Sequence, residues 1–503
     1  MRTRHTRTIT ALLWTLSASF GWCQQTEQLP QQQPAPASQQ QPANNTQPSN
    51  TAGQAATPGQ PIPAINPSTG QGETTEAGPS PVDTRPLAGA ELITPELPGS
   101  THSYILPSFS VWEGADSNSL LVPGMSRFEA ATIPVGVVDL NVAGRNNQFS
   151  LNLSGGGLLY DTAFSDSAGF AEAGFTDSYT TRRWSFLLSD RASYLPEASA
   201  GFAGIGFAGA FNNAPYLGVG SGPAALNPIF TPGQSVLAGQ FAATSNVSIA
   251  QAQYQLNATN SVSVTGSFGI QHYETGTGLQ SGNNTLTVFS WDHQLSATDS
   301  ISVSYSLIRY RYNGGTAAIN DNLWRLGYAK RISHRLALVA MVGPQLIYSA
   351  ESMVPGTQKN LSVTGMATLT YHIQRVGFSL AYLHYVSPGS GIFQGANTDS
   401  ATAGFTAQLT RTWDFSLSGA NSRNTRLAAY SINPAFPNPG AIDYEYGSVR
   451  LTHVMGRYMR AFVVYNLQHQ ASGALFVPGS TSTGLIRHIF GIGFELHPRP
   501  IGL

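Results

Sequence analysis

An alternation of polar and apolar residues recurs in short runs from about residue 104 to residue 497. In 262–273, one face of an extended chain carries Val262, Val264, Phe268 and Ile270, and the other carries Ser263, Thr265, Ser267 and Gln271. A strand that crosses a bilayer needs about 9–11 residues and sends alternate side chains to lipid and to the lumen. The pattern therefore predicts an all-β fold, a closed antiparallel transmembrane β-barrel.

The turns between these runs give the number of strands. Very short connections, such as those at 144–147, 258–260 and 455–456, alternate with longer ones. The predicted strands are 103–113, 129–143, 148–160, 171–180, 183–194, 246–257, 261–273, 285–296, 300–312, 321–332, 335–348, 361–373, 376–387, 400–410, 413–425, 442–454, 457–469 and 485–497. Short turns face the periplasm and long loops face outside, so this even count places both ends of the barrel in the periplasm.

The first hundred residues differ from the rest. Residues 1–23 have a basic start and a short apolar stretch ending at Cys23, the single cysteine, which predicts a cleaved signal peptide. Residues 24–100 are rich in Gln and Pro and poor in aliphatic residues, so they cannot bury enough surface to fold. We expect a disordered periplasmic linker there and the barrel over 101–503.

Charge excludes one class of partner. Only 10% of the residues are charged and the formal net charge is -1, which leaves no basic surface for nucleic acid. After the signal, no apolar run reaches the roughly 18 residues of a membrane helix. The composition therefore fits a membrane protein without apolar helices, in which the apolar residues alternate with polar ones along each strand.

Several stretches resemble uncharacterised outer-membrane barrels of the β-barrel porin type. They are 105–112 (ILPSFSVW) followed by 116–118 (DSN), then 181–190 (TRRWSFLLSD) through 194–197 (YLPE), and 487–494 (RHIFGIGF). Several barrels of this type are associated with exopolysaccharide gene clusters. The resemblance covers most of 101–503 and implies localisation in the bacterial outer membrane.

The last predicted strand also resembles the C-terminal signal read by the barrel-assembly machinery. Gly491, Phe494 and Leu496 keep the expected spacing, which implies that machinery as a partner during biogenesis. Ile489 stands where a polar residue is usual, and residues 497–503 extend past the strand. We expect Phe494 and Leu496 to face lipid beside the first strand.

The connection between residues 195 and 245 is far longer than the others. It lacks charged residues after Glu197 and carries the aromatics Phe202, Phe207, Phe211, Tyr216 and Phe230. Such a segment exposed to water would present an apolar patch. We interpret it as a constriction loop or plug folded into the lumen; the alternative is a hydrophobic outer cap or a self-association surface.

The residues expected to line the pore are mostly uncharged. They include Ser302, Ser304 and Gln408, interrupted by arginines at Arg325, Arg450 and Arg487. Barrels of 16–18 strands are wide enough for water, and hydroxyl and amide walls suit hydrated neutral solutes or polysaccharide.

Catalytic signatures are weak. His384 and Asp399 fall on adjacent predicted strands with Ser387 and Ser390 nearby, which is the only combination resembling a hydrolase triad. No metal motif occurs, and no cofactor is expected: residues 204–209 (GIGFAG) match Gly-x-Gly-x-x-Gly but lack the strand-then-helix context of a nucleotide site. The sequence therefore favours a non-enzymatic channel for small hydrophilic solutes or glycan export. A closed structural or adhesive barrel is the alternative, and an outer-membrane hydrolase is least favoured.

Overall fold

A computed structural model describes most of the predicted barrel. The described residues are 103–121, 127–161, 167–195, 242–274, 279–313, 318–350, 357–373, 375–387, 393, 395–427, 441–471, 484–496 and 498–503. The predicted signal peptide (1–23) and linker (24–100) lie outside them. So do the five aromatics of the predicted constriction loop.

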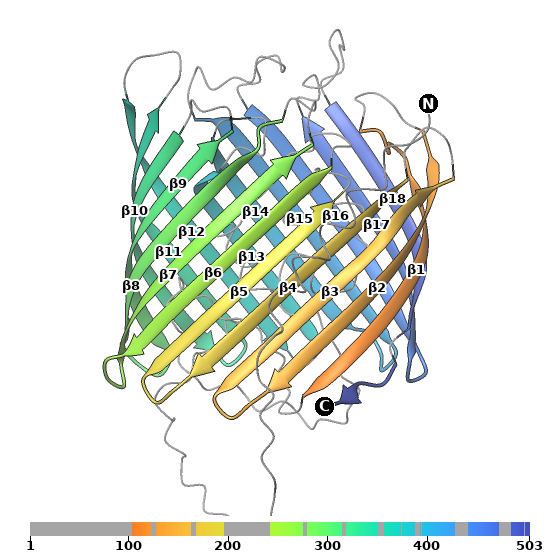
Figure 1. Cartoon of the computed structure of the whole chain (residues 1–503), viewed down its shortest axis with the longest axis horizontal. Coiled ribbons are helices and arrows are strands. Elements are labelled where there is room, and N and C mark those ends of the chain that lie inside the picture. Colours follow the sequence, from red (N-terminus) through yellow and green to blue (C-terminus); the bar gives the residue numbers. More distant parts are fainter. Residues whose placement is uncertain are drawn as a thin grey trace, which may run out of the picture. The chain divides into compact units, whose positions relative to one another are not determined.

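Eighteen long strands form one closed antiparallel barrel (Figure 1). They are β1 (Tyr104–Asp116), β2 (Glu129–Ala143), β3 (Asn147–Tyr160), β4 (Ala168–Thr180), β5 (Trp184–Leu195), β6 (Ala243–Gln255), β7 (Asn260–Tyr273), β8 (Gly282–Gln294), β9 (Asp299–Tyr312), β10 (Ala318–Ser333), β11 (Leu336–Ala350), β12 (Thr357–Ile373), β13 (Val376–Ser387), β14 (Ala396–Gln408), β15 (Trp413–Arg426), β16 (Ala441–Met455), β17 (Met459–Ala471) and β18 (Gly484–Leu496). Each pairs with its neighbours in sequence, and β1 pairs with β18. The predicted fold and strand count are confirmed.

Some strand ends were wrong in the prediction. β4 begins at Ala168 rather than at residue 171, and β10 begins at Ala318 rather than at 321. The small residues at these strand ends resemble loop residues in composition. They nevertheless pair with the neighbouring strand, as Gly157 does with Gly169. Pairing with a neighbouring strand, and not local composition, decides where these strands end.

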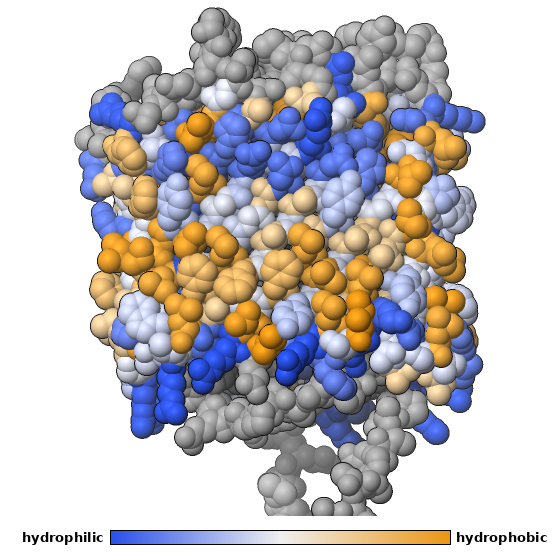
Figure 2. All heavy atoms as spheres, turned by 180° about the vertical axis from the view of Figure 1, so that it is seen from behind, coloured by the Kyte–Doolittle hydropathy of each residue, from blue (hydrophilic) through white to orange (hydrophobic). Residues whose placement is uncertain are grey.

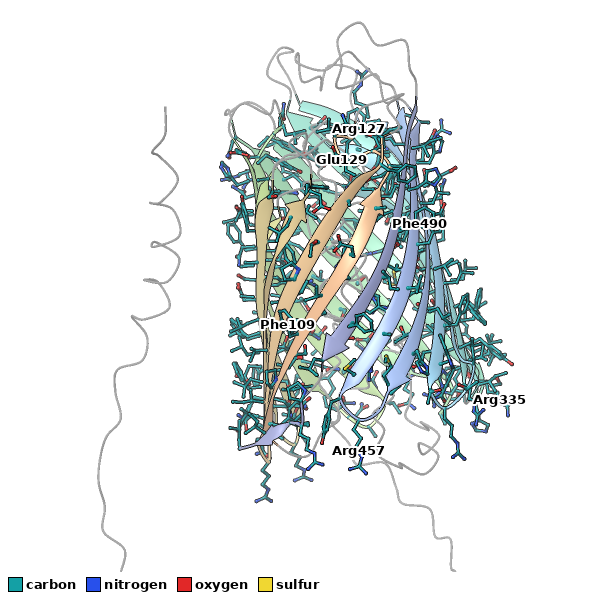
Figure 3. The ribbon with its side chains drawn as sticks, turned by 90° about the vertical axis from the view of Figure 1, so that its right-hand side faces the viewer. Phe109, Arg127, Glu129, Arg335, Arg457 and Phe490 are labelled. Carbon is teal, nitrogen blue, oxygen red and sulfur yellow. The ribbon has the colours of Figure 1, made fainter. Side chains whose placement is uncertain are left out.

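The short turns are built by local chemistry. In the turn between β6 and β7, the Asn257 side-chain oxygen accepts hydrogen bonds from the backbone N–H groups of Thr259 and Asn260, both at 2.9 Å. Between β16 and β17, Gly456 has a φ of 78°, a left-handed conformation that favours glycine. Arg335 and Arg457 lie in short turns at the same end of the barrel (Figure 3). We call this end the turn end and the opposite one the loop end.

The outward face carries a continuous apolar band. Figure 2 shows it as an orange belt with hydrophilic residues above and below. Large exposed side chains such as Phe289, Val303 and Trp324 belong to it. Near the turn end, aromatic pairs occur, including Trp184 with Tyr254 at 4.7 Å between ring centroids. An apolar band edged by aromatic residues is the lipid-facing surface of an outer-membrane barrel.

Within the described residues, no helix has the length and hydropathy needed to cross a membrane.

The seam between the first and last strands is as predicted. Phe494 lies opposite Val111 and Leu496 lies opposite Phe109, and both C-terminal side chains are half exposed on the outward face. Figure 3 shows Phe109 and Phe490 on this side of the barrel. The β1–β18 ladder spans only Phe109–Asp116 of β1.

The tail beyond β18 extends this seam. A two-residue strand, β19 (Ile501–Gly502), pairs with Tyr104 and Ile105, and the Leu503 backbone N–H donates to the Ser103 carbonyl at 3.2 Å. Proline at 498 and 500 cannot donate to a strand ladder, which separates β19 from β18. The tail thus pairs with the first two residues of β1, which β18 does not reach.

Deleting residues 498–503 should weaken the seam without abolishing the fold. Two residue pairs are lost, so we expect a loss of about 1–3 kcal/mol, at roughly 1 kcal/mol for each hydrogen bond. The measurement is the temperature at which heat-resistant gel mobility disappears. An alanine-substituted tail that keeps its backbone is the control, and equal behaviour of deletion and full-length protein would contradict the prediction.

Candidate functional site

The inward face of the barrel is the candidate site. Side chains alternate between lipid and lumen along each strand, so the burial pattern of β9 assigns Ser302 and Ser304 to the inside and Val303 to the outside. Strand pairing then joins inward residues of neighbouring strands into rows. One row, Ser263–Ser290–Ser304–Arg325, crosses β7 to β10.

This row is polar and buried. The hydroxyls of Ser263 and Ser290 lie 2.6 Å apart, and Ser304 is buried. Arg325 is also buried, and its Nη2 donates to the Ser306 hydroxyl at 3.2 Å. On β7 to β10, therefore, the predicted pore-lining side chains face inward but have little contact with water.

A second polar wall does reach water. The row Ser379–Gly404–Ser418–Ser448 crosses β13 to β16, and Ser418 is exposed although its parity is inward. Gly404 places no side chain between Ser379 and Ser418. Gln408, the last residue of β14, is exposed at the turn end. Ser418 is thus an inward hydroxyl group that water reaches.

The three predicted pore arginines are all buried. Arg450 donates from Nε to the Thr452 hydroxyl at 3.3 Å, and its guanidinium lies 4.0 Å from the Phe462 ring centroid. Arg487 is 0% exposed and forms an ion pair with Asp116, also 0% exposed, with Nε 2.9 Å from Oδ2. Since neither Asp116 nor Arg487 is exposed, neither presents a free charge to the lumen.

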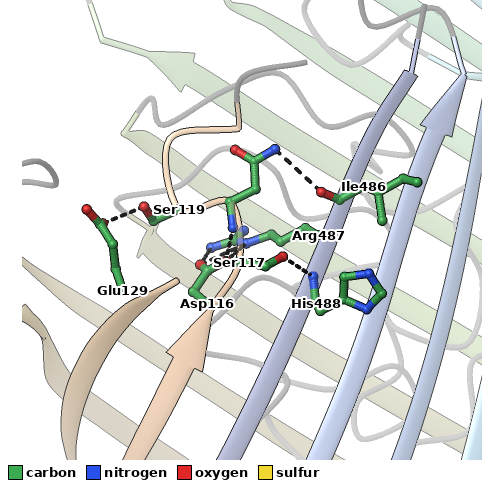
Figure 4. A network of polar contacts seen from close by, with 8 residues as sticks. Asp116, Ser117, Ser119, Glu129, Ile486, Arg487 and His488 are labelled. Atoms are coloured by element: carbon green, nitrogen blue, oxygen red, sulfur yellow. Dashed lines mark hydrogen bonds and ion pairs between the residues drawn. The ribbon is translucent and has the colours of Figure 1, made fainter. Parts of the chain in front are cut away.

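The Asp116–Arg487 pair belongs to a network across the seam (Figure 4). The backbone N–H of Asn118 donates to Asp116 Oδ1 at 2.9 Å, and the backbone N–H of His488 donates to the Ser117 hydroxyl at 2.8 Å. The Ser117 backbone N–H in turn donates to the His488 carbonyl at 2.9 Å. The network fastens the loop end of β1 to β18.

Other inward charges are paired as well. Arg191 forms an ion pair with Glu172, which is almost fully buried. Gln345 donates to the buried carboxylate of Asp321. The charges of Arg191 and Glu172 offset each other, and the Asp321 carboxylate is hydrogen-bonded by a neutral amide.

Two inward apolar clusters were missed by sequence reasoning. The first contains Leu187, Val247, Ile249, Leu286, Val288, Ile308, Tyr310, Tyr312, Ile319, Leu323, Ile347 and Val386. The second contains Trp112, Ala131, Ile133, Val135, Val137, Leu158, Tyr160, Phe170, Phe462, Val464 and Ile489. The sequence of β9 did indicate the first cluster, because Ile308, Tyr310 and Tyr312 lie on the same inward face as Ser302 and Ser304.

The first cluster reaches across the lumen near the loop end. The Tyr310 hydroxyl on β9 donates to the Val386 carbonyl on β13 at 3.0 Å. The β12–β13 ladder ends at Gly365 and His384, so the last residues of β13 depart from β12. The loop-end part of the lumen is therefore narrower than the circumference of an 18-stranded barrel implies.

The predicted hydrolase residues do not form a triad. His384 Nδ1 and the Tyr382 hydroxyl both lie 2.7 Å from Asp399 Oδ1, and all three residues point outward. Ser387 has inward parity, and its hydroxyl accepts a hydrogen bond from Thr398 at 2.8 Å. Histidine and serine thus lie on opposite faces of the wall. Ser390 lies outside the described residues.

The fold and the apolar belt define the class: this is an integral outer-membrane β-barrel. No protein-family model matches the chain. No curated protein matches it either.

The chain is similar to several solved porins at very low identity. OprD of Pseudomonas aeruginosa is 9% identical, with a TM-score of 0.39, and the match covers 79% of this chain and 95% of that one. OccK2 (OpdF) of the same organism is 8% identical over 78% and 98%, with a TM-score of 0.40. A BenF-like porin from Pseudomonas fluorescens Pf-5 is 7% identical over 79% and 100%, with a TM-score of 0.39.

Proposed function

We propose that the protein is a non-enzymatic outer-membrane channel for small hydrophilic, mainly uncharged solutes. The observation that carries this proposal is the water-accessible row Ser379–Gly404–Ser418–Ser448 inside an 18-stranded barrel. Barrels of this size leave room for an aqueous channel. Hydroxyl groups can exchange hydrogen bonds with a passing solute without holding it, as conduction requires.

The paired inward charges support weak ion selectivity. Asp116 and Arg487 neutralise each other, as do Glu172 and Arg191. A neutral sugar or oligosaccharide therefore suits this wall better than a selected ion, and glycan passage is the finer form of the proposal. Insertion by the barrel-assembly machinery is part of it, supported by the lipid-facing C-terminal residues Phe494 and Leu496.

A closed structural or adhesive barrel is the second candidate. The observation that favours it is the packing of apolar inward side chains at the loop end, including the Tyr310–Val386 contact across the lumen. Such packing can narrow a channel or close it. Conductance separates the two candidates, because a permanently closed barrel conducts no current.

Ser418→Trp should lower single-channel conductance in planar bilayers by about twofold, because an indole would occupy part of the aqueous cross-section. The matched control is Leu417→Trp, which adds the same ring to the neighbouring residue on the lipid-facing side. Added neutral oligosaccharide should block the wild-type current transiently. No current from any of the three proteins would favour the closed barrel instead.

A further inference from the structure

The outward faces of β8 to β12 carry a basic strip just above the apolar belt. Strand pairing places Thr285, Arg309, Asn320, Tyr348 and Lys359 in one row. Arg311 lies two residues further toward the loop end of β9. Arg309 and Arg311 are exposed, and the Lys359 ammonium lies 5.5 Å from the Tyr348 ring centroid.

The strip stands at the outer edge of the lipid-facing belt. Arg309 follows Asp299, at the turn end of β9, by ten residues. At about 3.3 Å per residue and a strand tilt near 40°, it lies about 25 Å above the turn end, the height of the apolar band of such barrels. Below it the outward residues are Leu307, Tyr305 and Val303. The cations thus lie where acyl chains meet headgroups in the outer leaflet.

Among the described residues, no acidic side chain forms an ion pair with these cations. In the loop-end halves of β8 to β12, the described outward residues include neither Asp nor Glu. No salt bridge involves Arg309, Arg311 or Lys359 among the described residues. Their positive charge is available to a ligand.

The neighbouring sector of the barrel differs in this respect. Across β13 to β16, His384, Asp399, Arg423 and Asp443 form one outward row, in which Arg423 Nε lies 3.8 Å from Asp443 Oδ1. Cations and carboxylates alternate there and compensate one another. The basic strip is therefore a property of one sector and not of the whole rim.

We propose that this strip, Arg309, Arg311 and Lys359 with the flanking Asn320, binds the phosphate groups of a phosphorylated glycolipid of the lipid A type in the outer leaflet. Arginine pairs with phosphate through two hydrogen bonds, and lysine does so as a point charge. Three strand spacings, about 14 Å, separate Arg309 from Lys359, so a headgroup with a phosphate at each end can engage both. Leu307 and Leu361 below the strip offer apolar contact to its acyl chains. The site is independent of whether the lumen conducts.

The test uses the full-length protein in detergent and native mass spectrometry with added bis-phosphorylated lipid A. The triple variant Arg309→Gln, Arg311→Gln, Lys359→Gln should bind this lipid roughly 100-fold more weakly than wild type. Each cation near an anionic headgroup contributes about fivefold to the affinity, and the three factors multiply. The matched control is Arg423→Gln, which removes a cation at the same rim that is already paired with Asp443. This variant should bind the lipid with an affinity within about twofold of wild type. Heat-resistant gel mobility checks that each variant is folded.

Two further ligands make the outcome decisive. Dephosphorylated lipid A should bind wild type as weakly as bis-phosphorylated lipid A binds the triple variant. Phosphatidylglycerol should bind at least tenfold more weakly than bis-phosphorylated lipid A, since it carries a single phosphate. Equal binding of all three lipids, or no loss in the triple variant, would overturn the proposal.

Discussion

Arg487→Met is expected to destabilise the barrel by about 3–5 kcal/mol, because it leaves Asp116 as an uncompensated buried charge. Both partners are fully buried, and the carboxylate accepts from both Nε and Nη2 of the guanidinium. The β1–β18 ladder covers only part of β1, so the pair lies at the joint with the least backbone support. Urea unfolding in lipid vesicles and the temperature of heat-modified gel mobility measure the loss.

The double variant Asp116→Leu, Arg487→Met is the informative companion. Replacing both members of a buried pair with apolar residues of similar volume is often close to neutral. We therefore expect the double variant to recover most of the lost stability. Arg423→Met, which breaks a largely exposed pair, should cost less than about 1 kcal/mol. A single variant as stable as wild type would show that the ion pair does not hold the seam.

The sequence predicted the barrel well because each strand carries its own alternation. Val303 and Ser304 point to opposite faces because they are consecutive residues of one strand, independently of how that strand pairs with others. The strand count and the neighbour of β18 follow from the same pattern and from the need to close the sheet. What alternation cannot supply is height along the barrel axis, which depends on the register of every strand.

Height explains the features that sequence reasoning missed. Arg487 was expected to line the pore, yet register brings it level with Asp116, 371 residues earlier, and the two charges neutralise each other. The separation of His384 from Ser387 has another cause: they are three residues apart, so alternation itself places them on opposite faces of β13. The inward apolar clusters are assembled from many strands. No single strand among them has an apolar run long enough to predict a cluster from the sequence.

The second large effect concerns the connection after β5, which sequence reasoning assigns to the lumen as a constriction. Deleting residues 201–233 should raise single-channel conductance several-fold, because it removes an uncharged, aromatic segment from a tube of porin width. Conductance and exclusion of neutral polymers of graded size are the measurements. The control deletes 474–481 in the shorter connection between β17 and β18, which should change conductance little.

Labelling decides where that segment lies when conductance alone is ambiguous. Phe207→Cys and Phe211→Cys should resist a membrane-impermeant thiol reagent too large to enter the lumen, because inward folding shields both positions from the outside. The natural chain has one cysteine, Cys23, within the predicted signal peptide, so the label would report the introduced thiols. Rapid labelling in intact cells together with unchanged conductance on deletion would place the aromatics on the outer surface. The segment would then serve as a cap or a self-association surface. The inward apolar clusters around Tyr310 and Trp112 would then be the groups that narrow the lumen.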